Sequence, residues 1–336
     1  MVLILNQTVE DMHLLINKTV ENLVNIPYFS PGFQAMSPIF SIKTTGSKPP
    51  LFCVHQMAGD VMGYFYLARR LSPEQPIYGL QAPGLDGQQE PYTKIPDLAA
   101  HHIEALSVFQ QSGPYFLGGQ SFGGFVAFEM ARQLQQQGHE VALLAIMDTS
   151  ALILGRISKV LNNAEMLVMR AKAIEYFFGK KLSVSYEELQ QQEPEEQLNY
   201  FVEKLKKVNV TIPDLEPQII RRKLQLMKAH HQALMSYVPQ VYLGKITFFR
   251  ASDLVNDFGV SSQDFLDRTL GWGELTTEPI EIHEVPGNHV TIMNEPHVRI
   301  LANKLTSCLN DSVAKPCKNQ LSVAGSTDPD CLLKFD

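Results

Sequence analysis

A serine lies midway between two glycines at Gly119 and Gly123, in the sequence Gly-Gln-Ser-Phe-Gly. The apolar residues Tyr115–Gly119 predict a short buried strand, and Gly123–Gln137 predict the helix that follows it. A strand that turns so directly into a helix has no room for side chains two positions on either side of the turn. The pattern therefore predicts a tight junction that raises the Ser121 hydroxyl above the edge of a sheet.

Such a junction is typical of the nucleophile elbow of α/β-hydrolases, in which the central serine attacks the substrate. The alternative is a glycine-rich turn that contains a serine by chance. The predicted strand and helix supply the structural context that the motif requires, so we interpret Ser121 as a nucleophile.

The composition excludes several classes of protein. The chain has 336 residues, of which 45% are hydrophobic and 19% charged, as in ordinary globular domains. A net charge of −7 without a long basic run argues against a nucleic-acid partner, and no apolar stretch reaches membrane-spanning length. The start, Met1–Leu5, is apolar but lacks the basic flank and cleavage site of a signal peptide.

The four cysteines have no C-x-x-C spacing and predict neither a disulfide framework nor a metal site. They occupy positions Cys53, Cys308, Cys317 and Cys331. This usage fits a reducing compartment, so we expect a cytoplasmic protein.

Apolar strands alternate with amphipathic helices along most of the chain. The predicted strands are Ile39–Lys43, Leu51–His55, Ile77–Gln81, Tyr115–Gly119, Val141–Met147, Ile246–Arg250 and Ile280–Val285. The predicted helices are Val61–Leu71, Ile95–Gln111, Gly123–Gln137 and Pro296–Leu309. This alternation predicts an α/β domain over residues 37–309 with a mainly parallel, doubly wound sheet. Ligands bind such sheets beyond the carboxyl ends of the strands, which is where Ser121 falls.

Three segments depart from that alternation. Residues 150–244 show helix and loop patterns without strands, and we expect a helical lid inserted into the sheet domain; a separate helical domain without a catalytic role is the alternative. Residues 1–36 predict a helical extension that either packs on the body or forms a homodimer. Residues 310–336 are polar and mixed, and we expect a disordered tail.

A serine nucleophile needs a base to take its proton and a carboxylate to orient the base. His289 follows the last predicted strand and is the expected base. Competing histidines are His55, His101, His102, His230, His231 and His283, of which His55 ends a strand and could border the site. Asp148 and Asp253 each follow a predicted strand at the same sheet edge, and the pattern leaves them equal candidates for the acid.

The tetrahedral intermediate of such a reaction needs two backbone N–H groups as an oxyanion hole. One comes from the residue after the nucleophile, which is Phe122, and the other from the loop after an early strand. In the loop at residues 55–59, Met57 is the expected donor.

The chain resembles the thioesterase domains that end nonribosomal peptide synthetases and modular polyketide synthases, over about residues 38–305. The resemblance rests on the segments Pro50–His55, Tyr78–Gly87, Gly113–Gly124, Leu144–Thr149 and Pro286–His289. It implies the α/β-hydrolase fold, a lid that matches residues 150–244, and Asp148 rather than Asp253 as the acid.

Two positions depart from the pattern of that family. The usual loop resembles His-Pro-x-Gly-Gly, whereas residues 55–59 read His-Gln-Met-Ala-Gly, so Gln56 stands where proline is usual. Gln120 precedes the nucleophile, where relatives often have an aromatic residue or histidine. Residues 1–36 contain no carrier-protein attachment motif, so the chain looks like an excised or stand-alone thioesterase.

The resemblance implies release of an acyl, peptidyl or polyketide chain from the phosphopantetheine thioester of a carrier protein in natural-product biosynthesis. Ser121 would form an acyl-enzyme, His289 would transfer protons, and Asp148 would orient His289. Water would then give a free acid, and a nucleophile within the chain would give a macrocycle. The enzyme would need no cofactor of its own. The alternatives are an editing thioesterase, a carboxylesterase acting on free esters and a non-catalytic interaction protein.

Overall fold

The computed structural model describes residues 38–208, 217–253 and 263–314. The expected N-terminal extension, with its possible dimer contact, lies outside these residues, as does the tail from residue 315 onward. Within the described ranges, no helix combines the length and apolar character needed to span a bilayer.

A sheet of seven strands runs through the described part of the chain in the order β1-β3-β2-β4-β5-β6-β7. The strands are β1 (Ile39–Lys43), β2 (Leu51–Val54), β3 (Ile77–Leu80), β4 (Tyr115–Gln120), β5 (Val141–Met147), β6 (Thr247–Ala251) and β7 (Glu281–Val285). The edge strand β1 pairs antiparallel with β3, whereas every other neighbouring pair is parallel. The prediction of a mainly parallel sheet is confirmed, and each predicted strand end lies within one residue of the observed end.

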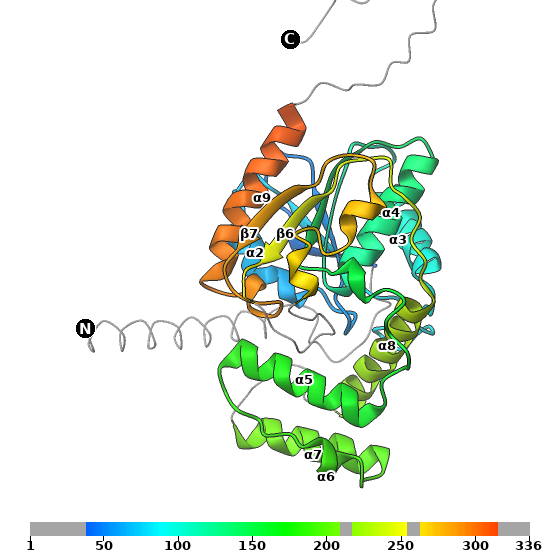
Figure 1. The fold of residues 1–336 in the computed structure, drawn as a ribbon, viewed down its shortest axis with the longest axis vertical. Helices are drawn as coiled ribbons and strands as arrows, with labels where there is room; N and C mark the ends of the chain where they lie inside the picture. The colour runs from blue at the N-terminus through cyan, green and yellow to red at the C-terminus, as the bar shows by residue number, and fades with distance from the viewer. Residues whose placement is uncertain (1–37, 209–216, 254–262, 315–336) are drawn as a thin grey trace, which may run out of the picture.

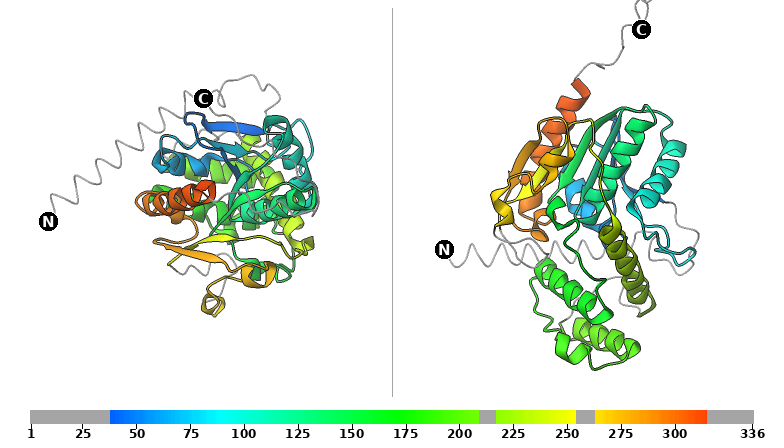
Figure 2. Two further views of the ribbon diagram at one scale, coloured as in Figure 1. Left: turned by 90° about the horizontal axis from the view of Figure 1, so that it is seen from above. Right: turned by 45° about the vertical axis from the view of Figure 1, so that its right-hand side comes forward.

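Helices cover both faces of this sheet (Figures 1 and 2). On one face lie α2 (Phe65–Arg70) and α9 (His297–Ala314), and on the other lie α3 (Ile95–Phe109) and α4 (Phe122–Gln136). Side chains alternate across the strands, so Phe52 joins the apolar cluster under α3 and α4, while Cys53 joins the cluster under α2 and α9. The central strands β2 and β4 are buried along their whole length because both faces are covered. Helix α9 runs five residues past its expected end at Leu309.

A helical insertion separates β5 from β6, as the absence of strand signals predicts. It contains α5 (Asn163–Phe178), α6 (Tyr186–Leu189), α7 (Pro194–Lys207) and α8 (Pro217–Ser236). These helices bury an apolar cluster of their own, which includes Leu167, Phe201 and Leu224. Figure 1 shows α5 to α7 standing away from the sheet, with α8 reaching back toward it. The loop after β2 packs against this cluster through Met57 and Ala58.

The junction between β4 and α4 consists of a single residue, because β4 ends at Gln120 and α4 begins at Phe122. A Cβ atom on Gly119 would lie 2.1 Å from the carbonyl oxygen of Gly123. A Cβ atom on Gly123 would in turn lie 2.5 Å from the carbonyl oxygen of Val54. Backbone atoms cannot give way to such contacts, so both positions require glycine.

Replacement of Gly119 by alanine is expected to lower the free energy of unfolding by about 1–3 kcal/mol or more, because the backbone of α4 must move. Gly118→Ala is the matched control on the same strand. Its Cβ would meet flexible side-chain ends, the Met147 methyl at 3.2 Å and the Cys53 sulfur at 3.5 Å. Its free energy of unfolding should change by less than about 1 kcal/mol. Urea denaturation measures the free energy of unfolding of each variant. Equal losses in Gly119→Ala and Gly118→Ala would contradict the close approach at Gly119.

Candidate active site

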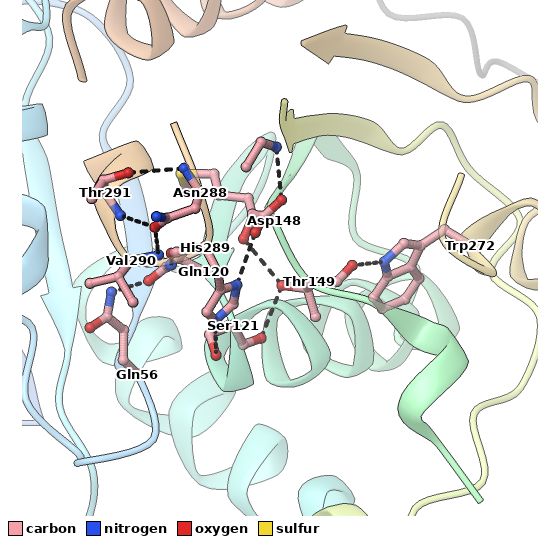
Figure 3. Close-up of polar contacts among 12 residues, drawn as sticks. Gln56, Gln120, Ser121, Asp148, Thr149, Trp272, Asn288, His289, Val290 and Thr291 are labelled. Atoms are coloured by element: carbon pink, nitrogen blue, oxygen red, sulfur yellow. Dashed lines mark hydrogen bonds and ion pairs between the residues drawn. The ribbon is translucent and has the colours of Figure 1, made fainter. Parts of the chain in front are cut away.

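Ser121 adopts a backbone conformation that residues with a side chain rarely populate. Its φ is +57° and its ψ is −125°. Hydrogen bonds hold it in place: its N–H donates to Met147 O at 3.3 Å, and its carbonyl accepts from the Thr149 hydroxyl at 3.0 Å. Thr149 is itself fixed, since the Trp272 indole N–H donates to its carbonyl at 2.7 Å (Figure 3). Strain of this kind persists only where surrounding contacts determine the conformation.

The His289 imidazole lies between Ser121 and Asp148 (Figure 3). Its Nε2 lies 3.0 Å from Ser121 Oγ, and its Nδ1 lies 2.9 Å from Asp148 Oδ2. An ionised carboxylate only accepts hydrogen bonds, so Nδ1 carries the proton and the Nε2 lone pair faces the serine hydroxyl. This is the tautomer that can accept a proton from Ser121.

Asp148 and Asp253 have different surroundings, although each follows a strand. Asp148 is buried, with a φ of +44°, and its Oδ1 accepts from Ala251 N–H at 2.8 Å. Asp253 is exposed; its Oδ1 accepts from the Ser252 hydroxyl at 2.8 Å, and its N–H donates to Gly287 O at 2.9 Å. The geometry therefore favours Asp148 as the partner of His289. Asp253 instead binds the neighbouring loop through its backbone N–H.

The loop that carries His289 is fixed by its own side chains. Asn288 Oδ1 accepts from the N–H groups of Val290 and Thr291, each at 3.0 Å. The Thr291 hydroxyl accepts from Asn288 N–H at 2.9 Å, which closes the turn around His289 (Figure 3).

Two glutamines join this loop to the loop after β2. The Gln56 amide donates to Gln120 Oε1, and Gln120 Nε2 donates to the His289 carbonyl at 2.6 Å (Figure 3). Gln120 is buried, and its backbone N–H donates to the Tyr64 hydroxyl at 2.9 Å. These glutamines occupy the two positions at which the sequence departs from the family pattern. We call the hydrogen-bonded side chains of Gln56 and Gln120 the amide relay. The sequence gives no sign of their contact, because 64 positions separate them.

The two expected oxyanion donors lie at the start of α4 and in the loop after β2. Among the described residues, neither the Phe122 nor the Met57 N–H donates a hydrogen bond to another group. A backbone amide without an internal partner can donate to a developing negative charge.

The competing histidines have other surroundings. His55, His102 and His230 are buried, and burial lowers the pKa of each to about 3, so all three are uncharged near neutral pH. The His55 ring stacks on that of His230 at a centroid distance of 4.9 Å and meets that of His102 edge to face at 5.5 Å. The sequence pattern marks His230 only as a competing base and carries no signal for its packing against the loop after β2.

One group in the described part of the chain offers metal-ligating atoms within 4.8 Å of one another: Glu281, His283 and Cys308. The Lys245 ammonium already pairs with Glu281, and burial raises the pKa of the Cys308 thiol to about 11. A positive charge beside the carboxylate and a protonated thiol both oppose a cation. The contacts fit a hydrogen-bonded cluster between β7 and α9, with Cys308 Sγ 3.2 Å from His283 Nε2.

Comparison with known proteins identifies the family. The thioesterase domain model matches residues 49–308. The chain belongs to the thioesterase domain family. This family is one of hydrolases, and the predicted resemblance to nonribosomal peptide synthetase thioesterases is confirmed by the relatives and structures that follow.

The relatives matched by sequence are much longer proteins. Malpibaldin synthetase of Mortierella alpina is 31% identical over 277 residues, which cover 82% of this chain and 4% of the synthetase. A dimodular nonribosomal peptide synthase of Bacillus subtilis is 43% identical over 115 residues, or 34% of this chain and 5% of the synthase. This thioesterase domain thus spans a small fraction of the length of these relatives.

Solved structures show the same fold. A four-domain nonribosomal peptide synthetase bound to AMP and glycine superposes with a TM-score of 0.72 at 28% identity, over 81% of this chain and 20% of that one. The NocB thioesterase domain, in a covalent complex with a fluorophosphonate nocardicin G analogue, gives a TM-score of 0.55 at 21% identity, over 81% of this chain and 99% of that one. The α/β-hydrolase fold expected from the sequence is confirmed.

A double-mutant cycle tests the amide relay. Gln120→Ala removes the hydrogen-bond partner that the half-buried Gln56 amide and the His289 carbonyl share, and we expect it to cost about 1–3 kcal/mol of unfolding free energy. The cycle is completed by Gln56→Ala and the double variant, and we expect a coupling energy between the two positions of about 0.5–3 kcal/mol.

The control is Gln240→Ala, because Gln240 contacts Arg132 near the other end of α4. Its effect should add to that of Gln120→Ala within about 0.5 kcal/mol. A coupling between Gln56 and Gln120 no larger than in this control would contradict the relay.

Proposed function

We propose that this thioesterase domain releases an acyl or peptidyl chain from the phosphopantetheine thioester of a carrier protein through an acyl-enzyme on Ser121. The observation that carries the proposal is the continuous hydrogen-bond path from Asp148 through His289 to Ser121, with distances of 2.9 and 3.0 Å. Proton removal along such a path turns a weak hydroxyl nucleophile into an effective one.

The first step is attack of Ser121 Oγ on the thioester carbonyl while His289 Nε2 takes the hydroxyl proton. The imidazolium that forms is stabilised by the Asp148 carboxylate, whose other oxygen is held by Ala251 N–H. The Phe122 and Met57 amides receive the oxyanion, and each donor contributes about 2.7–4 kcal/mol of transition-state stabilisation. His289 then donates this proton to the departing thiolate as the C–S bond breaks, which gives the acyl-enzyme and the free phosphopantetheine thiol.

The second step replaces the serine by another nucleophile. His289 removes a proton from water, which gives the free acid, or from a hydroxyl or amine of the bound chain, which gives a macrocycle. In each case His289 passes this proton to Ser121 Oγ as the bond between Oγ and the acyl group breaks. We propose that the insertion over residues 150–244 acts as the lid that decides between these outcomes, because lids admit or exclude water.

Two other functions share this chemistry. An editing thioesterase would clear short, misloaded acyl groups from carriers, and a carboxylesterase would act on free esters. Similarity to nonribosomal peptide synthetases supports a carrier-bound substrate.

Turnover of a carrier-bound thioester is expected to exceed that of the matched free oxoester, and Ser121→Ala should lower it by about 10⁶-fold. Stopped assays resolved by mass spectrometry report the rate, the Ser121 adduct and whether the product is acid or ring. Ser107→Ala, which changes an exposed serine on α3, is the control and should act like the parent. Undiminished turnover in Ser121→Ala would rule out the mechanism, and equal rates on the oxoester would favour a carboxylesterase.

Asp148→Asn is expected to lower kcat by about 10⁴-fold, because an amide facing Nδ1 favours the wrong imidazole tautomer. Asp253→Asn is the matched control, since it makes the same chemical change on the neighbouring strand end. It should leave kcat near that of the parent. A larger loss in Asp253→Asn than in Asp148→Asn would reverse the assignment of the acid.

A further inference from the structure

Two histidines hold the peptide groups on either side of Met57. His55 Nδ1 lies 2.8 Å from the Gln56 carbonyl oxygen, and His230 Nδ1 lies 2.8 Å from the Met57 carbonyl oxygen. A carbonyl oxygen only accepts hydrogen bonds, so both imidazoles donate from Nδ1. Each ring is therefore fixed in its Nδ1–H tautomer.

These contacts determine where the Met57 N–H points. The Gln56 carbonyl and the Met57 N–H belong to one planar peptide group and lie on its opposite edges. A donor that holds the carbonyl therefore aims the N–H away from His55. His230 fixes the next peptide group in the same way, so both backbone torsions of Met57 are constrained.

The His230 ring also contacts the second expected oxyanion donor. Its centroid lies 4.5 Å from that of the Phe122 ring at an interplanar angle of 18°, and 4.9 Å from that of His55 at 26°. One side chain thus touches both Met57 and Phe122, the two residues expected to supply the oxyanion donors. Burial keeps the His230 pKa at about 3, so this stack carries no charge near neutral pH.

His230 comes from α8, the last helix of the insertion, and other contacts dock this helix on the same loop. The buried Lys223 ammonium pairs with Asp60 Oδ2 at 2.9 Å. A Cβ atom on Gly59 would lie 2.9 Å from a methyl of Leu226, so glycine permits the close approach of helix and loop. Helix α8 therefore bears on the loop after β2 along several of its turns.

We infer that His230, together with His55, orients the Met57 amide, so that the oxyanion hole is complete only while α8 rests on this loop. The inference rests on the proposed function and assigns His230 as a positioning residue that acts through Met57 and Phe122. The insertion then does more than shape the substrate pocket, because it supplies part of the support for transition-state stabilisation.

Three substitutions at His230 separate its hydrogen bond from its packing. His230→Phe keeps the ring and removes the donor. His230→Asn places an amide N–H where Nδ1 was, whereas His230→Gln places it one bond further along. The control is His231→Phe, because His231 neighbours it on α8 but interacts with Glu165 of α5.

The readouts are kcat and KM on a carrier-bound thioester, and the affinity for a trifluoromethyl ketone analogue, whose adduct with Ser121 carries an oxyanion. We expect His230→Phe to lower kcat by about 10²–10³-fold, with KM nearly unchanged and ketone affinity reduced in parallel. His230→Asn should recover most of the loss, and His231→Phe should resemble the parent.

The inference fails if His230→Phe, once thermal denaturation has shown that it is folded, keeps the kcat and ketone affinity of the parent. It also fails if the substitution raises KM and changes nothing else. Where His230→Phe does not fold, equal kcat values for His230→Asn and His230→Gln would overturn it, because the two place the donor differently. Failure of the proposed function has a separate signature, since turnover would then persist in Ser121→Ala.

Discussion

The positive φ of Ser121 is the constraint on which the rest of the site depends. An L-residue in this conformation costs of order 1–3 kcal/mol, so the surrounding structure must keep it there. Glycines allow the turn to close, Met147 and Thr149 bind its backbone from β5 and the loop that follows, and Trp272 binds Thr149. As a result, the Ser121 hydroxyl lies beyond the end of β4, next to Phe122 at the start of α4.

Parallel strands bring the remaining groups to that hydroxyl. Met57, Asp148 and His289 follow β2, β5 and β7, and the carboxyl ends of these strands meet at one edge of the sheet. Local contacts then orient each group: Ala251 N–H holds the carboxylate of Asp148, and Asn288 closes the turn around His289. The sheet brings these groups to the same region, and hydrogen bonds then fix the exact position of each side chain.

Sequence patterns were sufficient to place the strands, the turn at Ser121 and the loop that carries His289, because each depends on residues close together in the chain. They left Asp148 and Asp253 equal, since both follow a strand and spacing does not reveal burial. The bond from Ala251 N–H to Asp148 and the exposure of Asp253 distinguish the two. The contact of Gln56 with Gln120 and that of His230 with Met57 join distant segments, and no periodicity encodes such pairs.

Met57 also has a side chain, and it packs against both the cluster under α3 and α4 and the separate apolar cluster of the insertion. Met57, the proposed oxyanion donor, thus packs between two hydrophobic cores. A chimera that received the insertion of another thioesterase would receive a new neighbour for this residue as well. Under the proposed mechanism, such an exchange would change substrate range and turnover rate together, unless the loop at Met57 were redesigned as well.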